Sequence, residues 1–413
     1  MLRPTLCSAL AVVLLAGASF AQDSDFGVTV PMTLSAGAMR TGRLQEDDPS
    51  RSLYSEGFRI MLYPTFKLGK HWFGYAAVQL RENPYFYYDA YYPGHAFDTD
   101  AIQAYIGYST RLENTSIVIK AGQLTTAFGS FPLRYDDTEN PLLDQPLSYI
   151  TQLPIRGDQL ICNVADLRKN SYGWVAGSCG GNGGWAGGLT PVTLYGLPGA
   201  QIEASRGHFD GRLQFTGRSP AVSDEWTTRL SYFQWAAGGG YTITQGVRIG
   251  MSAFRGPYLD RVVSSYLPAG TSIRDFPATG VGIDGQFVRG HWNINGEWQR
   301  FQFDLPNFTV SPTTTAGYGE VKRILTPRFY AAVRAGYLKN GSVTDASGVS
   351  LPLASIAPTL TDVEFGGGIW LRRNLLLKGS YGWLHMPGSD DGEYNVLGLQ
   401  LVATIHKLNW AWR

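Results

Sequence analysis

Beyond its first twenty residues the sequence lacks any run of about 18 apolar residues, which is the length that a membrane-spanning helix needs. It also has little charge: 16% of its 413 residues are charged, and 34 basic residues stand against 33 acidic ones. A net charge of +1 offers no general surface to a polyanion, so we expect no nucleic-acid partner. With 44% hydrophobic residues the chain is still too apolar to be disordered.

Motifs for catalysis and cofactor binding are missing as well. The sequence contains neither Gly-x-Ser-x-Gly nor His-Glu-x-x-His, and its glycine-rich run from Cys179 to Gly188 has no Gly-Lys-Ser/Thr. The acidic segment Asp390-Asp391-Gly392-Glu393 fits a solvated turn or a divalent cation site. We predict no enzymatic activity, no cofactor and no metal site.

The N-terminus has the three parts of a secretory signal. Arg3 supplies a positive start, Leu6 to Gly17 form a short apolar core, and Ser19 and Ala21 are small residues at the positions that signal peptidase reads. We expect cleavage after Ala21, so that residues 1–21 are a signal peptide and residues 22–413 are the exported protein.

Cysteine is rare, and only two of the three cysteines lie beyond the expected signal peptide. Cys162 and Cys179 are 17 positions apart in an exported chain, which predicts one local disulfide. Such a loop would stabilise the fold by about 3 kcal/mol in the chain-entropy picture. Two free or metal-bound cysteines remain the alternative, although no second Cys/His pair lies at metal-ligand spacing.

Glycine and tyrosine are abundant instead, with 50 and 23 residues. From about residue 28 onward, apolar and polar residues alternate in segments of about ten. In residues 247–253, Val247, Ile249 and Met251 alternate with Arg248 and Gly250. A repeat of two predicts β-strands with one apolar and one polar face. The length matches the 9–11 residues of a tilted membrane-crossing strand and exceeds the usual strand of a soluble sandwich.

The connections between these segments fall into two classes. Seven are short and lie at Gly69–His71, Leu112–Asn114, His208–Gly211, Thr244–Gly246, Arg289–His291, Ile324–Pro327 and Arg372–Asn374. The others are mostly longer and span residues 41–53, 82–98, 123–198, 219–227, 257–278, 305–313, 340–360 and 387–392. Short turns at one rim and long loops at the other are typical of an outer-membrane barrel. We predict an all-β, transmembrane antiparallel β-barrel of about 16 strands, with short periplasmic turns and long extracellular loops.

Aromatic residues cluster near the predicted strand ends. Trp72, Trp292 and Phe329 follow short turns, whereas Phe301, Tyr337 and Trp383 lie near the opposite ends. Amphipathic rings at these two levels predict interfacial girdles, with ordinary core packing as the alternative. The Tyr85-Phe86-Tyr87-Tyr88 and Tyr91-Tyr92 segments lie in a long loop, where the rings fit sugar stacking, a packed lid or a lipid interface.

A local motif supports this architecture. The strand end Lys120-Ala121-Gly122-Gln123-Leu124 is followed by Thr126-Ala127-Phe128-Gly129. With the other features it resembles Gram-negative porins of the 16-stranded kind, with the phosphate-selective porin family and its relatives as the nearest likeness. The resemblance implies a water-filled channel, a third loop (residues 123–198) that folds inward, and a homotrimer. The chain ends in Arg413 rather than an aromatic residue, a departure from these porins that leaves the register of the closing strand open. The sequence also has no arginine ladder, so phosphate selectivity is not implied.

The polar strand faces and the third loop supply the candidate functional residues. Pore-lining candidates are Arg59, Lys120, Arg212, Arg248, Arg334, Lys378, Glu203, Asp284, Glu297, Glu320 and Glu364. Constriction-loop candidates are Arg134, Asp136, Asp137, Glu139 and Asp144. An acidic loop facing basic wall residues would create a transverse field that orients dipolar solutes. Pairing of these charges between neighbouring strands is the alternative. Glycine runs at 238–240 and 366–368 are expected to allow curvature or close loop packing.

The sequence therefore predicts an outer-membrane porin through which small hydrophilic solutes or ions diffuse passively, with membrane lipid and its own copies as partners. A second hypothesis is a surface-exposed binding or structural barrel whose lumen is plugged by residues 123–198. A third is a soluble exported β-sandwich lectin, in which the apolar faces would meet in a core.

Overall fold

The computed structural model describes residues 26–41, 54–82, 85, 97–153, 155–169, 179–181, 188–193, 196–219, 233–356, 359–386 and 393–405. The expected signal peptide, the tyrosines beyond Tyr85 in its loop, Asp390, Asp391 and residues 406–413 lie outside these ranges. Among the described residues, no helix is both long enough and apolar enough to cross a membrane.

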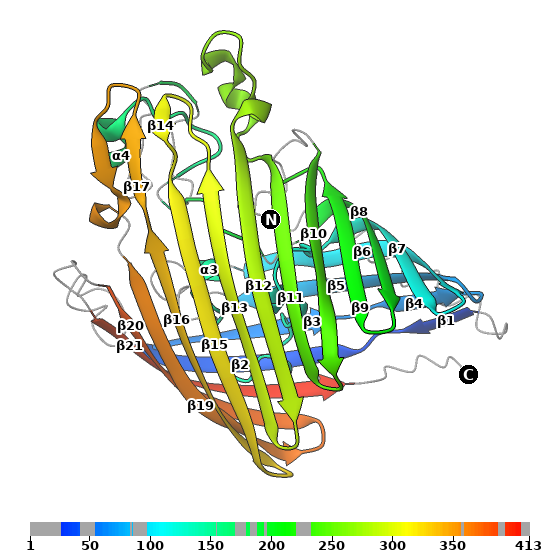
Figure 1. Ribbon diagram of the computed structural model, residues 1–413. Coiled ribbons are helices and arrows are strands. Elements are labelled where there is room, and N and C mark those ends of the chain that lie inside the picture. Colours follow the sequence, from blue (N-terminus) through cyan, green and yellow to red (C-terminus); the bar gives the residue numbers. More distant parts are fainter. Residues whose placement is uncertain are drawn as a thin grey trace.

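Antiparallel strands form one closed ring (Figure 1). The ring strands are β2 (Met32–Thr41), β3 (Tyr54–Leu62), β5 (Trp72–Glu82), β6 (Phe97–Leu112), β7 (Thr115–Leu124), β8 (Leu197–Arg206), β9 (Phe209–Thr216), β10 (Gln234–Thr244), β11 (Val247–Pro257), β12 (Pro277–Arg289), β13 (Trp292–Phe303), β15 (Thr313–Thr326), β16 (Phe329–Asn340), β19 (Leu360–Arg372), β20 (Leu375–His385) and β21 (Glu393–Ile405). Each strand pairs with its neighbours in chain order, and β21 closes the ring by pairing with β2. The prediction of about 16 strands is confirmed.

Two further strands continue members of the ring. β1 (Phe26–Thr29) precedes β2, β4 (Thr65–Leu68) follows β3, and β1 pairs with β4. Pro31 and Pro64 lie at the two interruptions, because proline has no N–H to donate to the ladder. Their carbonyl groups still accept hydrogen bonds, from the Tyr63 N–H to Pro31 at 2.9 Å and from the Ala76 N–H to Pro64 at 2.9 Å.

Short and long connections alternate around the ring, as the sequence predicts. All seven predicted short turns are present, although the turn after β8 is Gly207-His208 rather than His208–Gly211. Gly207 and Gly290 have φ values of 58° and 59°, a region that favours glycine, so the chain can reverse within two residues there. The connections at the opposite rim are longer. The first residue of β2 and the last residue of β21 both lie at the short-turn rim.

The burial pattern is inverted relative to a soluble protein. Apolar side chains exposed on the outer face include Ile106, Ile119, Ile202, Leu213, Ile249, Met251, Val281, Ile283, Trp298, Val333, Phe365 and Leu399. Polar side chains buried on the inner face include Arg59, Gln79, Gln201, Gln214, Glu297, Gln299, Glu320, Arg334, Glu364, Lys378 and Gln400. Met251 is 70% exposed, whereas Arg334 is 0% exposed. An apolar outside and a polar inside are what a bilayer around a barrel requires, and they exclude the lectin sandwich.

The outer aromatic residues agree only in part with the predicted girdles. Trp72, Trp292 and Phe329 are 52%, 41% and 41% exposed beside the short turns, and Tyr337 is 39% exposed towards the other rim. The prediction for Phe301 is wrong. This ring is 0% exposed and faces inward, where it packs 5.6 Å from the ring of Phe128.

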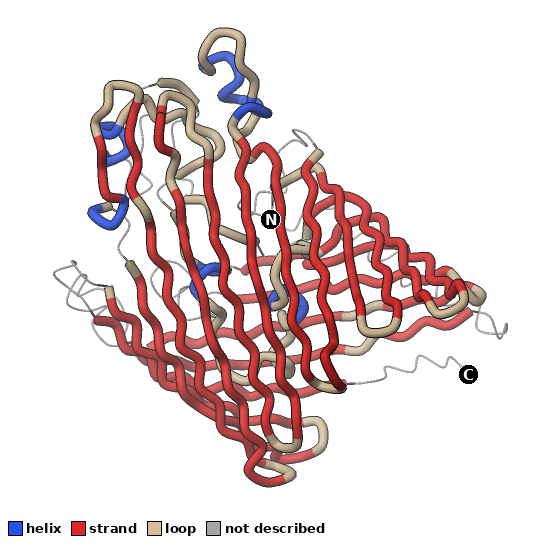
Figure 2. The backbone as a smooth tube through the Cα atoms, viewed as in Figure 1, coloured by secondary structure: helices blue, strands red, loops and turns tan. Residues whose placement is uncertain are grey.

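The connection between β7 and β8, residues 125–196, is the longest and has two parts. Residues 125–153, with η2 (Phe131–Leu133) and the short helix α3 (Leu147–Ile150), contact the inner wall of the barrel (Figure 2). Residues 155–169, with α4 (Val164–Lys169), pack at the long-loop rim. They lie there beside a small sheet of β14 (Phe308–Val310), β17 (Ser342–Asp345) and β18 (Ser350–Pro352).

In the part of the chain that the structure describes, three further 3-10 helices lie in the loops, namely η3 (Arg261–Tyr266), η4 (Ile273–Asp275) and η5 (Leu353–Ser355). The predicted disulfide is confirmed: Cys162 and Cys179 are bonded, with their Cα atoms 5.4 Å apart. It crosslinks the outer part of the third loop rather than the part inside the barrel.

Candidate channel constriction

The third loop first runs along the inner wall of β9 to β12. The Arg212 guanidinium donates to the Ala127 carbonyl at 2.9 Å, and the Gln214 amide binds the Ala127 N–H at 2.9 Å. The Ser252 hydroxyl accepts from the Gly129 N–H at 3.1 Å. The loop comes so close that a Cβ on Gly238 would lie 2.7 Å from the Ala127 carbonyl. The glycine at this position is therefore needed for close loop packing, as predicted.

Glu297 on β13 then holds the turn of the loop. Its carboxylate accepts from the Ser130 and Phe131 backbone N–H groups at 3.0 and 2.6 Å. It also accepts from the hydroxyls of Tyr149 at 2.7 Å and Tyr318 at 2.9 Å. Glu297 is 5% exposed and forms no ion pair with any described residue. A buried carboxylate with so many donors fixes the backbone without a basic partner.

The loop crosses the lumen at Arg134 and Tyr135. Arg134 forms an ion pair with Glu320 on β15 at 2.5 Å, whereas the Tyr135 hydroxyl bonds that of Tyr75 on β5 at 2.8 Å. In the ring of sixteen, β15 and β5 are seven strands apart in one direction and nine in the other. Two consecutive residues therefore reach nearly opposite walls, and the chain forms a bar across the lumen at this level.

Beyond the bar, two aspartates bind the wall of β2 and β3. Asp136 accepts from the hydroxyls of Thr33 at 3.0 Å and Tyr63. Asp137 forms an ion pair with Arg59 at 3.1 Å and accepts from the hydroxyl of Ser35 at 2.7 Å.

Tyr85 also binds Asp137, through its hydroxyl at 3.0 Å. Burial alone would raise the pKa of Asp137, but Arg59 and the Lys378 ammonium, with these hydrogen bonds, hold it below its usual value. Tyr85 is buried, so this ring of the predicted tyrosine cluster is a loop anchor rather than an exposed sugar platform.

The return path of the loop is held by charged side chains that bind backbone groups. The Lys378 ammonium donates to the carbonyls of Asp137, Asn140 and Leu142 at 2.8, 3.2 and 3.2 Å. The Glu364 carboxylate accepts from the Leu143 N–H at 2.9 Å and from the Asp144 N–H at 3.2 Å. These bonds use the backbone itself, so they do not depend on which side chains the loop has there.

Arg334 completes this part of the wall. It donates to the Asp144 carbonyl at 2.5 Å and forms ion pairs with Glu364 at 2.6 Å and Glu320 at 3.3 Å. The Asp144 carboxyl itself has a buried oxygen without a hydrogen bond among the described residues. Burial, together with the neighbouring Glu364, raises the pKa of Asp144 well above its usual value.

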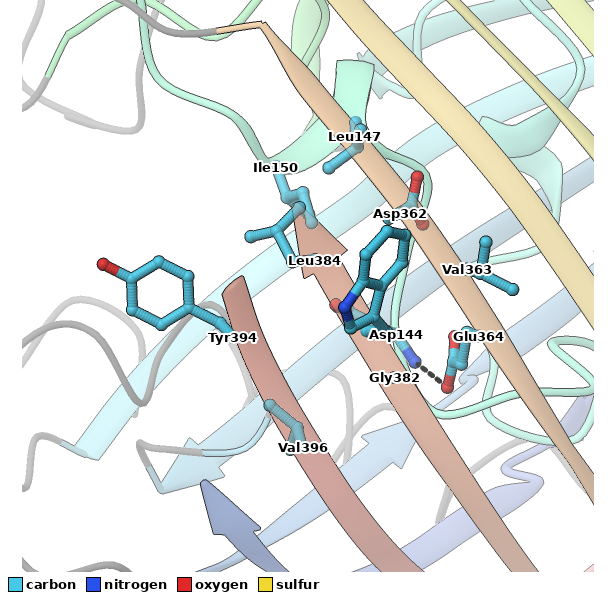
Figure 3. A pocket seen from close by; sticks show the side chains of 11 residues that line it. Asp144, Leu147, Ile150, Asp362, Val363, Glu364, Gly382, Leu384, Tyr394 and Val396 are labelled. Atoms are coloured by element: carbon cyan, nitrogen blue, oxygen red, sulfur yellow. Dashed lines mark hydrogen bonds between the residues drawn. The ribbon is translucent and has the colours of Figure 1, made fainter. Parts of the chain in front are cut away.

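The helix α3 and the adjoining strand ends enclose a small pocket of ≈ 60 Å³ (Figure 3). Its lining is mostly apolar, with Leu147 and Ile150 from α3 facing Leu384 and Val396. Leu147 also packs in a buried cluster with Ala316, Leu338 and Leu360. The pocket is part of the packing that holds the loop.

A second set of inward-facing charges is largely free of the loop. We call Lys120, Glu203, Asp210, Arg212, Arg248 and Asp284 the lumen charges. Lys120 pairs with Glu203 at 2.6 Å, and Arg248 pairs with Asp210 at 2.7 Å and Asp284 at 2.9 Å. The Lys120, Glu203 and Arg248 side chains are 18%, 34% and 27% exposed. Among the described residues of the loop, only Arg212 of these side chains finds a bonding partner, so β7 to β12 keep an accessible charged inner wall.

The other six predicted wall residues have a different environment. We call Arg59, Glu297, Glu320, Arg334, Glu364 and Lys378 the anchoring charges. Each is at most 5% exposed and bonds the third loop. Of the predicted constriction-loop residues, Arg134, Asp136 and Asp137 bond the wall through their side chains and Asp144 through its backbone, and only Glu139 is exposed. Pairing between neighbouring strands, the alternative to a transverse field, occurs at Lys120–Glu203, Arg248–Asp284 and Arg334–Glu364.

Sequence reasoning missed several residues of this site. Asp210 lies on the same strand face as Arg212 and Gln214, so the alternation could have identified it. The sequence prediction assigns Asp210 to the turn His208–Gly211 instead, which is two residues longer than the observed turn Gly207-His208. Tyr149 and Tyr318, which bind Glu297, are ordinary tyrosines in the sequence, and no local pattern marks them.

No protein-family model matches this sequence, and no curated protein matches it. Solved structures do match along nearly the whole chain, and the following are similar. The anion-selective porin from Comamonas acidovorans has a TM-score of 0.54 at 10% identity, covering 92% of this chain and 100% of that one. The outer membrane channel DcaP of Acinetobacter baumannii has a TM-score of 0.55 at 10% identity, covering 94% and 99%. OmpT, an outer membrane protein of Vibrio cholerae, has a TM-score of 0.51 at 10% identity, covering 94% and 100%. At this identity the likeness establishes the fold, which is that of 16-stranded outer-membrane porins.

Proposed function

We propose that this protein is an outer-membrane porin, a passive diffusion channel for small hydrophilic solutes or ions. The observation that carries the proposal is the division of the inner wall. The third loop binds and buries the charged side chains on one side of the lumen. It leaves the lumen charges of β7 to β12 partly exposed. A polar, partly exposed strip beside a loop that is bonded to both walls is suited to water-filled passage of limited width.

Conductance of the purified protein in a planar lipid bilayer tests this function. We expect discrete, stable steps of current that scale with salt concentration. A folded, membrane-inserted protein that produces no steps would contradict the proposal. Folding is checked separately by the difference in gel mobility between heated and unheated samples.

A plugged binding or structural barrel is the second candidate, and one observation favours it. The bar at Arg134 and Tyr135 reaches nearly opposite walls, so the loop obstructs the lumen at this level. Liposome swelling with sugars of increasing size separates the two functions. A channel admits the smaller sugars at measurable rates, whereas a plugged barrel admits none.

The finer features of the proposal rest on the sequence pattern and, for trimer formation, on the resemblance to porins. We propose that residues 1–21 are removed on export, that the barrel resides in the outer membrane, and that three copies associate as a homotrimer. We also propose that its nearest functional relatives are the phosphate-selective porins, without phosphate selectivity. Mass spectrometry of the protein isolated from outer membranes and gel filtration in detergent test cleavage and trimer formation.

A further inference from the structure

Five arginines lie at three consecutive short turns of the barrel, either in the turn or near the end of the strand that leads into it. The turns join β12 to β13, β15 to β16 and β19 to β20, and the first two lie at the lower edge of Figure 1. We call Arg289, Arg323, Arg328, Arg372 and Arg373 the arginine arc. All five are exposed. The turns and their flanking residues, 289–292, 323–329 and 371–375, contain no aspartate or glutamate.

The arc is adjacent to the outer aromatic residues. Arg289 and Arg323 lie directly across the ladder from Trp292 on either side. The guanidinium carbon of Arg323 is 4.8 Å from the centre of the Trp292 ring, and that ring is 41% exposed on the outer face. Phe287 and Phe329 are also exposed there. Tryptophan with stacked arginine is a combination suited to the boundary between hydrocarbon and headgroups.

The charges of the arc are uncompensated, unlike those inside the barrel. None of the five arginines forms an ion pair with a residue in the described part of the chain. Inside the lumen, by contrast, Arg59, Arg134, Arg248 and Arg334 each have a carboxylate partner. Five neighbouring cations without acidic partners form a local positive field in a protein whose net charge is only +1.

We propose that the arginine arc binds the phosphates of anionic phospholipids in the leaflet next to the short turns. The apolar belt of the outer face ends at this level, so the guanidinium groups lie where headgroup phosphates lie. Guanidinium groups bind phosphate in a bidentate manner. Attraction of solutes to the channel mouth would require basic side chains on the lumen side, whereas Arg289 and Arg323 share the outer face with Trp292.

Photocrosslinking tests this binding in vesicles of phosphatidylcholine that contain a photoactivatable phosphatidylglycerol or, in a parallel sample, a photoactivatable phosphatidylcholine. Labelled peptides are mapped by mass spectrometry. The test variant combines R289Q, R323Q and R328Q. The matched control combines R255Q, R300Q and K339Q, which remove three exposed basic residues from the same barrel wall nearer its opposite rim.

We expect phosphatidylglycerol to label the peptides around residues 289 and 323–328 more strongly than phosphatidylcholine does, and high salt to weaken the labelling. At roughly fivefold per removed charge, the test variant should lose apparent affinity on the order of 100-fold. The control should keep labelling at the arc. Equal labelling by the two lipids, or full labelling of the test variant, would overturn the proposal. Bilayer conductance of each variant verifies folding, and lipid binding can fail while the channel function remains.

Discussion

The charged side chains on the inner wall of β13, β15, β16, β19 and β20 differ sharply from the ion-paired side chains on β7 to β12, although Gln214 and Ser252 on that second wall also bind the loop. On the first, Glu297, Glu320, Arg334, Glu364 and Lys378 are at most 5% exposed and bind the third loop. On the second, the paired side chains of Lys120, Glu203, Arg248 and Asp210 are 18–42% exposed. The residue types are the same, and the difference lies in what covers them.

This contrast shows that a charged inner wall has two separate roles in one barrel. A buried charge is costly to desolvate, so it is retained only with close partners, and here the loop backbone supplies many of them. A half-exposed charge keeps its water and contributes little to stability, but it acts on ions that pass. Substitutions on the anchoring side should therefore change stability, and substitutions on the lumen side should change selectivity.

The largest effect is expected for R334M. Removing this guanidinium leaves the buried Glu364 without its ion-pair partner and Glu320 with Arg134 alone, which should cost about 3–5 kcal/mol of unfolding free energy. R248M on the lumen side is the matched control and should cost about 1 kcal/mol or less. Urea unfolding of the protein in lipid vesicles measures both values. Equal losses of unfolding free energy in R334M and R248M would mean that charged side chains on the two walls contribute equally to stability.

A smaller effect should distinguish two aspartates of the same loop. D137N removes the carboxylate that forms an ion pair with Arg59 and should destabilise by about 2–3 kcal/mol, because the replacement amide keeps some hydrogen bonds. D144N should change stability by less than about 1 kcal/mol, because burial already favours the neutral form of Asp144. The same urea assay applies. A larger loss in D144N than in D137N would contradict this assignment.

The Asp137 contribution should also depend on pH. Its pKa is lowered in the folded protein, so the stabilisation is present above the unfolded value of about 3.9 and is lost as the pH falls below it. The difference in urea midpoint between wild type and D137N should therefore shrink as the pH falls from about 5 to about 3. A difference in urea midpoint that grows as the pH falls would mean that the pKa of Asp137 is raised in the folded protein rather than lowered.

The smallest energetic effect, but a clear functional one, is expected for R248Q. Loss of this cation leaves Asp210 and Asp284 unpaired in the lumen and should shift the reversal potential in a salt gradient towards cation preference. R255Q lies on the outer face of the same strand and should leave the reversal potential unchanged. A shift of equal size in both variants would indicate an effect of net charge alone.

The ring, the turns and the disulfide could be predicted from the sequence, because alternation, turn residues and cysteine spacing are local properties. The roles of individual residues could not. Phe301 lies on the inward face of β13 with Glu297 and Gln299, and this apolar ring is buried there because the third loop brings Phe128 against it. Lys378 and Glu364 bind backbone groups, which every sequence contains, so no side-chain pattern marks their partners.

The most direct measurement of the division between the two walls uses a cysteine reagent during bilayer recording. Val118 on β7 faces the lumen beside Glu203, whereas Ala332 on β16 is buried in a cluster with Leu142 of the loop. V118C channels should lose conductance in steps when a charged methanethiosulfonate is added, and A332C channels should not respond. Block of A332C, or an inert V118C in an open channel, would contradict the arrangement of the loop described above.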